Sequence, residues 1–274
     1  LQRYSLHGQT MGTQYSAVFF ADAHVDEVRI NAALFAAVDV VDRQMSNWKT
    51  DSDLSRLNHA PENEWLAVPT ALFDVIKCAL QVGQQSHGAF DIGVGDVVRA
   101  WGFGPSLGQT DEPQMQALKA QTYQSAADAL ELHPDQCQVR KRARITLDLS
   151  GIAKGYAVDQ LARCLDGFGI SRYLVGIDGE MRARGTKPDG QPWAIAIEKP
   201  VRNLREVMGV MALSDAAIAT SGDYRSWVDY QGKSYSHSIN GALREPVSNQ
   251  LAAVTVLAAN CMLADAWATA LLVL

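Results

Sequence analysis

One unit in the middle of the chain limits the possible folds most. Residues 143–150 (ARITLDLS) predict a strand, residues 151–155 (GIAKG) a turn, and residues 171–177 (SRYLVGI) a second strand. The segment between them has apolar residues at helical spacing, at positions 157, 158, 161, 162 and 165, and glycines at 167 and 169 end the helix. The core of this chain must therefore combine strands with a packed helix.

The rest of the chain adds mostly helices before this unit and mostly strands after it. Before it we expect a strand around residues 15–19, helices over 25–45 and 71–87, a loop over 46–65, a glycine-rich connection over 90–105, helix-permissive sequence over 111–130, and strands over 138–140 and 144–149. After it we expect strands over 193–199, 207–213, 226–239 and 252–258 and a closing helix from Cys261. The sequence predicts an α+β fold, with residues 1–274 as a single domain in which two closely packed lobes are an alternative.

Charge and cysteine usage narrow the function classes. The formal net charge is −6, and no basic stripe is present that could bind a polyphosphate backbone, so nucleic acid is not an expected partner. An acidic chain can still hold an anionic nucleotide if its site supplies backbone N–H groups, a few cations or a divalent metal. The four cysteines form no CxxC pair, and we expect free, mostly buried thiols. No apolar stretch reaches the roughly 20 residues of a membrane-spanning helix.

The closing helix offers a site for a hard cation. It is apolar nearly all round, yet Asp265 and Thr269 lie four residues apart and so share one face. A buried carboxylate needs a cationic partner, a proton or a metal ion, because an unpaired buried charge is costly. A carboxylate together with a hydroxyl oxygen suits magnesium. The alternative is an Asp265 that caps or pairs with a neighbouring element.

Three other features could carry chemistry. The turn SGIAKG resembles a phosphate-binding loop, because backbone N–H groups, a helix N-terminus and Lys154 attract anions, although the Walker pattern is absent. Trp48 is an aromatic residue in a polar loop that either stacks on a ring or only covers the core. His237 in SYSHSIN is the best-placed general base, although a single histidine is more often structural. Without a GxSxG elbow, a serine hydrolase is excluded.

Eight segments, in chain order, resemble the ApbE family of FAD:protein FMN transferases. They are MGTQYSA, MSNWKTDSDLSRLN, GAFDIGVGDVVRAWGFG, LDLSGIAKGYAVDQLA, WAIAIEKP, AIATSGDYRSW, YSHSIN and CMLADAWATALLVL, and they span about residues 11–274. The resemblance implies a compact, T-fold-related α+β arrangement of mixed or antiparallel sheet with packed helices, with FAD held between lobes. It also implies a magnesium-dependent enzyme that cuts FAD at its pyrophosphate. FMN would pass to a threonine or serine hydroxyl of an acceptor protein, with release of AMP.

The resemblance further implies which residues form the site. The cofactor-binding residues would be Met11, Trp48, Ala89, Phe90, Asp91, Ser150, Lys154 and Asp159, with Thr220, Ser221 and Asp223 on the phosphate side. The magnesium ligands would be the backbone carbonyl of Ala153 and the side chains of Asp265 and Thr269. In that reaction His237 would accept or relay the proton of the acceptor hydroxyl, and Asp265 would hold the metal.

Departures from the family pattern bear on these expectations. Trp48 stands where many relatives have tyrosine, Asp178 stands where a double glycine is common, and residues 239–246 (INGALREP) replace the usual turn after the histidine. The altered turn puts the choice of acceptor in doubt. Because the chain stops at Leu274, inside what should be a helix-to-strand junction, we expect a short C-terminal segment to be missing.

Two other functions stay open, and partners follow from the resemblance alone. An FAD pyrophosphatase would use water in place of the acceptor hydroxyl, and a flavin-binding protein would hold FAD without turnover.

For a transferase, the expected partners are acceptor flavoprotein subunits of membrane redox complexes, in the periplasm or otherwise outside the cytoplasm. A lipid anchor, as in an inner-membrane lipoprotein, is the only expected membrane contact. A first residue other than methionine also leads us to expect a targeting segment before Leu1.

Overall fold

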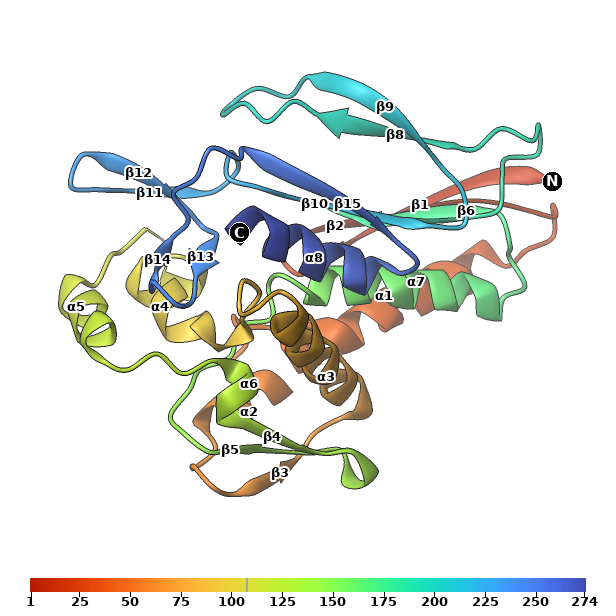
Figure 1. Ribbon diagram of the computed structural model, residues 1–274. Coiled ribbons are helices and arrows are strands. Elements are labelled where there is room, and N and C mark those ends of the chain that lie inside the picture. The colour runs from red at the N-terminus through yellow and green to blue at the C-terminus, as the bar shows by residue number, and fades with distance from the viewer. Residues whose placement is uncertain (107) are drawn as a thin grey trace. The chain divides into compact units, whose positions relative to one another are not determined.

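The structure, a computed structural model, describes residues 1–106 and 108–274. These residues fall into two units, which are described separately below (Figure 1). Unit 1 comprises Leu1–Asp42, Ile152–Thr220 and Thr255–Ala268, and unit 2 comprises Arg43–Gly151, Ser221–Val254 and Thr269–Leu274. The chain therefore changes unit inside the closing helix α8 (Cys261–Val273).

Unit 1 is built on a six-stranded sheet. Its strand order is β1 (Gln2–Thr10), β2 (Thr13–Ala21), β6 (Tyr173–Ile177), β7 (Glu180–Arg184), β10 (Ala217–Gly222) and β15 (Ala253–Ala258), the last two running on into unit 2. We expected one strand at the start of the chain, whereas the structure has the hairpin β1–β2. Its two-residue turn holds Met11 at φ +44° and Gly12 at φ +72°, the left-handed pair that matches the twist of a hairpin.

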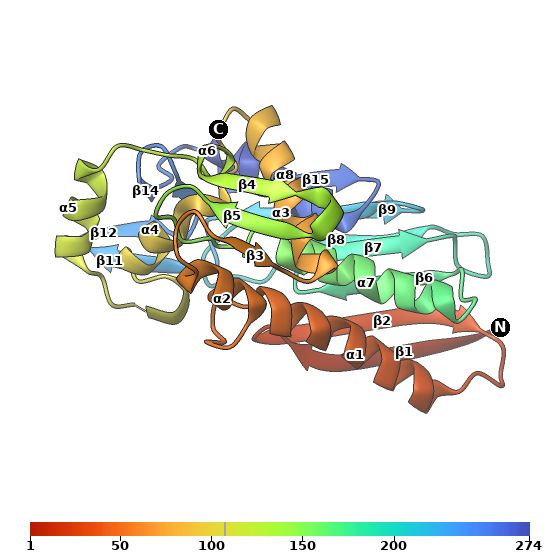
Figure 2. The same ribbon diagram turned by 90° about the horizontal axis from the view of Figure 1, so that it is seen from below.

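Both faces of this sheet are covered. Along β2, Tyr15, Ala17 and Phe19 are almost fully buried, as expected of the strand face under helices α1 (Glu27–Met45) and α7 (Ala153–Gly167), which lie across the strands in Figure 2. The alternate residues of β2, Val18 and Phe20, pack with a cluster around Trp193 and Leu213. That cluster belongs to a separate hairpin, β8 (Trp193–Glu198) and β9 (Val207–Leu213), on the opposite face (Figure 1).

Unit 2 is mainly helical, with short strands. Its helices are α2 (Asp53–His59), α3 (Thr70–Gln85), α4 (Gly95–Ala100), α5 (Glu112–Ala120) and α6 (Ala126–Ala129). Its strands form a sheet in the order β3 (Trp65–Ala67), β5 (Gln138–Lys141), β4 (Leu130–His133), and two hairpins, β11 (Trp227–Tyr230) with β12 (Lys233–Ser236) and β13 (Ile239–Asn240) with β14 (Glu245–Pro246). One core cluster joins Trp101 and Phe103 to Met115 and Leu118 of α5 and to Val228 and Ile239 of the hairpins.

Most of the predicted elements are confirmed, and three expectations further along the chain are wrong. The expected loop 46–65 contains α2, whose cap is Ser52: its hydroxyl accepts the N–H of Ser55 at 3.0 Å. The expected connection 90–105 contains α4. Residues 144–149 form no strand in the part of the chain that the structure describes, because their backbone bonds go elsewhere. Leu147, for example, donates to the Asn58 side chain at 2.8 Å and accepts from it at 3.0 Å.

Two further expectations concern cysteines and membranes. All four cysteines are free thiols, with Cys78 and Cys261 buried and Cys137 and Cys164 half-buried. Among the described residues, no helix combines the length and the apolar composition that crossing a bilayer requires.

Candidate functional site

The site residues predicted from the sequence divide between the two units. Unit 1 holds Met11, Ala153, Lys154, Asp159, Thr220 and Asp265, and unit 2 holds Trp48, Ala89, Phe90, Asp91, Ser150, Ser221, Asp223, His237 and Thr269. Each set is described within its own unit.

The centre of the first set is the contact between helices α7 and α8. The backbone N–H of Gly155, in the first turn of α7, donates to Asp265 Oδ2 at 2.9 Å, and Asp265 is only 4% exposed. A Cβ on residue 155 would lie 2.4 Å from the Cys261 carbonyl oxygen and 2.7 Å from Asp265 Cβ. Only glycine therefore lets the two helices approach closely enough to make this hydrogen bond.

Charged side chains surround Asp265. Lys154 Nζ lies 2.9 Å from Glu180 Oε1 and 3.5 Å from Asp178 Oδ2. Glu180 is buried, and its Oε2 has no hydrogen-bond partner among the described residues. Neither acidic residue was among the candidates found in the sequence. The one signal was the departure IDGE at the end of a buried strand.

Two acidic residues of this cluster, Asp265 and Glu180, have a raised pKa. Burial, and then the Glu180 carboxylate, raise the pKa of Asp265 to about 7, against the opposing effects of Lys154 and the Gly155 N–H. Burial also raises the pKa of Glu180, although Lys154 opposes the rise. For Lys154, burial alone would lower the pKa, but Glu180, Asp265 and Asp178 raise it well above its usual value. The ammonium is therefore charged, and a further cation beside Asp265 would stabilise its carboxylate.

Asp159, on α7, bonds through its side chain to the start of α8. Its Oδ1 accepts the N–H of Cys261 and its Oδ2 accepts the N–H of Met262, both at 3.0 Å, and Arg182 pairs with Oδ1 at 2.6 Å. These contacts satisfy backbone donors that a helix N-terminus leaves unpaired. The carboxylate thus holds the start of the helix that carries Asp265, whereas its proposed contact with the cofactor stays a prediction.

The close contact at Gly155 yields a stability test. Gly155→Ala is expected to destabilise the protein by about 1–3 kcal/mol, because the new methyl group overlaps the backbone of α8. The matched control is Gly167→Ala at the end of the same helix, where a Cβ would meet no described atom within 4 Å. That variant should be neutral or more stable by up to about 1 kcal/mol. Urea unfolding of both variants measures the difference, and equal stabilities would contradict the assigned helix contact.

In unit 2, Asp91 organises a cavity. Its Oδ1 accepts the backbone N–H groups of Gly93 at 2.8 Å and Ala126 at 3.0 Å, and its Oδ2 accepts the Tyr123 hydroxyl at 2.6 Å. Burial, and then the bond to Asp91, raise the pKa of Tyr123 well above its usual value, so the phenol stays a donor. Phe90, Asp91 and Tyr123 help to line a cavity of about 320 Å³. Two of the residues predicted to bind cofactor therefore lie at a cavity.

Thr269 belongs to a second group in unit 2. Its Oγ1 lies 3.1 Å from Ser221 Oγ. A Cβ on Gly151 would lie 3.0 Å from that Thr269 oxygen and 3.2 Å from Phe90 Cε2. Because Gly151 has no side chain, Thr269 and Phe90 can both approach its backbone.

The remaining predicted residues have simpler surroundings. The Trp48 side chain is 58% exposed, and Met11 lies at the tip of the β1–β2 hairpin. His237 is exposed, with its backbone N–H 3.2 Å and its Nδ1 3.3 Å from the carbonyl oxygen of Ser226. The hydroxyls of Thr220 and Thr255 lie 2.8 Å apart. The backbone N–H of Ser150 donates to the Asp148 side chain at 2.8 Å, and the backbone N–H of Asp223 donates to the Ala252 carbonyl at 3.0 Å.

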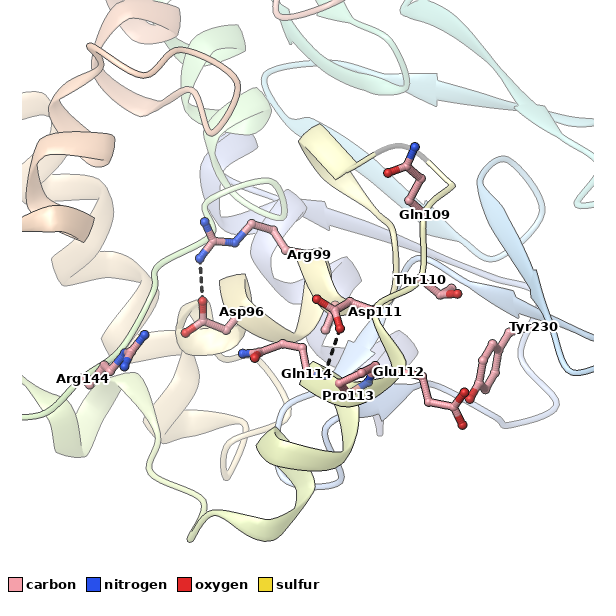
Figure 3. A pocket seen from close by; sticks show the side chains of 11 residues that line it. Asp96, Arg99, Gln109, Thr110, Asp111, Glu112, Pro113, Gln114, Arg144 and Tyr230 are labelled. Atoms are coloured by element: carbon pink, nitrogen blue, oxygen red, sulfur yellow. Dashed lines mark hydrogen bonds and ion pairs between the residues drawn. The ribbon is translucent and has the colours of Figure 1, made fainter.

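A larger cavity of unit 2 contains none of the predicted residues. Its volume is about 780 Å³, and Figure 3 shows its lining of mixed charge, in which Arg99 and Asp96 pair at 2.5 Å. Asp111 is already engaged there as the cap of α5, since it accepts the N–H of Gln114 at 3.0 Å. The volume of a cavity does not by itself identify a catalytic site. The buried charged residues around Asp265 are stronger evidence for one.

In unit 1, the Asp265 carboxylate and the Ala153 carbonyl are oxygen donors of the kind that a magnesium ion would require. Among the described residues, no three His, Cys, Asp or Glu side chains are grouped as metal ligands, so a cation site must also use hydroxyl or carbonyl oxygens. The buried Asp265 carboxylate and the carbonyl of Ala153 would supply such oxygens within unit 1. The burial of the Asp265 carboxylate is the observation that supports the fit, because a cation would offset the cost of its buried charge.

Comparison with known proteins gives one consistent result. The model of the ApbE family matches residues 11–274. A protein of Klebsiella pneumoniae named FAD:protein FMN transferase is 37% identical over 98% of this chain and 78% of its own length. The solved structure of the flavin transferase ApbE from Vibrio cholerae is 37% identical, with a TM-score of 0.88 over 99% of this chain and 87% of that one. The apo flavinyl transferase ApbE of Pseudomonas stutzeri is 31% identical, with a TM-score of 0.86 over 99% and 84% of the two chains.

Proposed function

This chain belongs to the ApbE family and is a flavin-transferring enzyme, and we propose that it moves FMN from FAD to a threonine or serine hydroxyl of an acceptor protein. The acceptor oxygen attacks the phosphorus on the riboflavin side of the pyrophosphate. The bond between the two phosphates breaks, a phosphoester forms, and AMP leaves. The α+β fold and the ApbE-like arrangement expected from the sequence are those of the solved relatives.

The observation that carries this proposal is the buried acidic cluster beside the first turn of α7. Phosphoryl transfer requires positive charge near the pyrophosphate, and Lys154 supplies one such charge. A magnesium ion held by Asp265, Thr269 and the Ala153 carbonyl would neutralise developing negative charge on the phosphate oxygens. Asp159 and Gly155 fix the position of α8 and hence of Asp265.

Other residues of the chain bind and orient the reactants. We propose that Phe90 and Asp91, at the 320 Å³ cavity, contact the cofactor, together with Met11, Trp48, Ala89 and Ser150. Thr220, Ser221 and Asp223 would lie on the phosphate side. His237 would accept the proton of the acceptor hydroxyl. Because a carbonyl oxygen can only accept, the bond to Ser226 places a proton on Nδ1, so that the lone pair of a neutral ring lies on Nε2.

Partner and compartment are proposals that rest on the family resemblance alone. The acceptors would be flavoprotein subunits of membrane redox complexes. The enzyme would act in the periplasm or otherwise outside the cytoplasm, with a lipid anchor as its membrane contact.

One incubation tests the proposed reaction. Purified protein is mixed with FAD, magnesium and a domain bearing a threonine acceptor motif, and the acceptor mass and AMP release are followed. We expect a mass gain equal to one FMN phosphoester and an equal amount of AMP. AMP and free FMN with an unmodified acceptor would instead indicate a pyrophosphatase. FAD binding without either product would indicate a non-catalytic flavin protein.

A further inference from the structure

Strand β9 in unit 1 has an open backbone edge. It pairs with β8 in a sheet that has two strands in the part of the chain the structure describes, so its other edge carries unpaired N–H and C=O groups. Figure 1 shows β9 as the outermost strand of its hairpin. The sequence of β9, VMGVMAL, contains no charge and no proline, the features with which proteins usually protect such an edge.

The same strand concentrates exposed apolar side chains. Val207 is 58%, Met208 63% and Val210 69% exposed, and the loop before them adds Val201 at 42% and Leu204 at 41%. A Cβ on Gly209 would meet no described atom within 4 Å. The first half of β9 is therefore open on both faces as well as at its edge, and an exposed apolar strand of this kind marks an association site.

We propose that β9 pairs with β9 of a second copy of this chain, in antiparallel orientation across a two-fold axis at Val210. Such an interface is self-complementary, because each copy presents the same strand to the other. The lack of charge on β9 removes the self-repulsion that would oppose this pairing. In the register centred on Val210, Val207 faces Leu213 of the partner subunit and Met208 faces Ala212 of the partner subunit.

Charge at the strand ends selects this register. Arg205 precedes β9 by two residues and Asp215 follows it by two, and both are exposed. Pairing about Val210 brings Arg205 toward Asp215 of the partner subunit at both ends of the interface. Pairing about Gly209 or Met211 would instead align Arg205 with apolar residues. The apolar loop residues Val201 and Leu204 extend the buried area beyond the strand.

The proposal is tested by the oligomeric state of the wild type and of two variants in which an exposed valine is replaced by lysine. Wild type should sediment as a dimer and Val210→Lys as a monomer with unchanged thermal stability, because a lysine on an edge strand blocks edge pairing. The control Val28→Lys, at a position 81% exposed on α1, should remain dimeric. A monomeric wild type overturns the proposal. If that monomer binds vesicles of phosphatidylglycerol and Val210→Lys does not, the strand is a membrane contact instead.

A cysteine variant tests the register. Residues directly opposite in an antiparallel pair lie roughly 4.5–5.5 Å apart at Cα, within reach of a disulfide. Val210→Cys should therefore form a covalent dimer under mild oxidation, beyond any produced by the native thiols of wild type under the same conditions. Val28→Cys should not. Equal cross-linking of both variants, or of neither, would overturn the two-fold axis at Val210.

Discussion

Asp265→Asn is expected to lower magnesium-dependent FMN transfer by at least about a hundredfold, because the charge that a metal ion stabilises in phosphoryl transfer contributes several kcal/mol. Asp265 is the one charged ligand in the proposed set, since the Ala153 carbonyl and the Thr269 hydroxyl are neutral. The amide keeps an oxygen that can accept the Gly155 N–H, so the contact between α7 and α8 should survive.

Thermal unfolding distinguishes a variant that no longer binds magnesium from one that no longer folds. Without magnesium, Asp265→Asn should unfold no more easily than wild type, because it removes a buried carboxylate that lies in the field of Glu180. Added magnesium should raise the unfolding temperature of wild type but not of the variant, since only a protein that binds the ion is stabilised by it. The control is Asp74→Asn on the exposed face of α3, which should behave as wild type in both assays. Unchanged transfer by Asp265→Asn at limiting magnesium would refute the metal assignment.

Local sequence patterns predicted the elements whose hydrogen bonds are local. Helices α1, α3 and α7 follow from apolar spacing along one segment, because a helix satisfies its own backbone. Residues 144–149 have the alternation of a strand, yet the partner of Leu147 is the side chain of Asn58, 89 residues away. Nothing in the local sequence signals that bond. The short helix α2 was missed because its seven residues carry the turn-forming and capping residues of a loop.

The site residues likewise divide into those that the local sequence identifies and those that only the folded structure brings together. Asp265 and Thr269 could be found because their spacing on one helix is a local property. Glu180 and its bond to Lys154, 26 residues away, become visible only once β7 and α7 are packed together. The contact of Asp159 with the start of α8 spans 102 residues and likewise depends on the fold. Resemblance to a family assigned the remaining positions, and experiment has to test them one at a time.

His237→Ala is expected to slow transfer by roughly 10²–10⁴-fold while FAD binding is retained, because a positioned general base contributes about that much to proton transfer. The bond between Nδ1 and the Ser226 carbonyl holds the ring in place, and the lone pair on Nε2 would take the proton. Single-turnover transfer and the fluorescence of bound FAD, measured on the same preparation, separate the chemical step from binding.

Whether His237→Ala loses FMN transfer or FAD binding decides the role of His237. The exposed His24, replaced by alanine, is the control and should leave both measurements unchanged. If the variant instead loses FAD while its residual bound fraction turns over at the normal rate, His237 binds the cofactor and another group takes the proton.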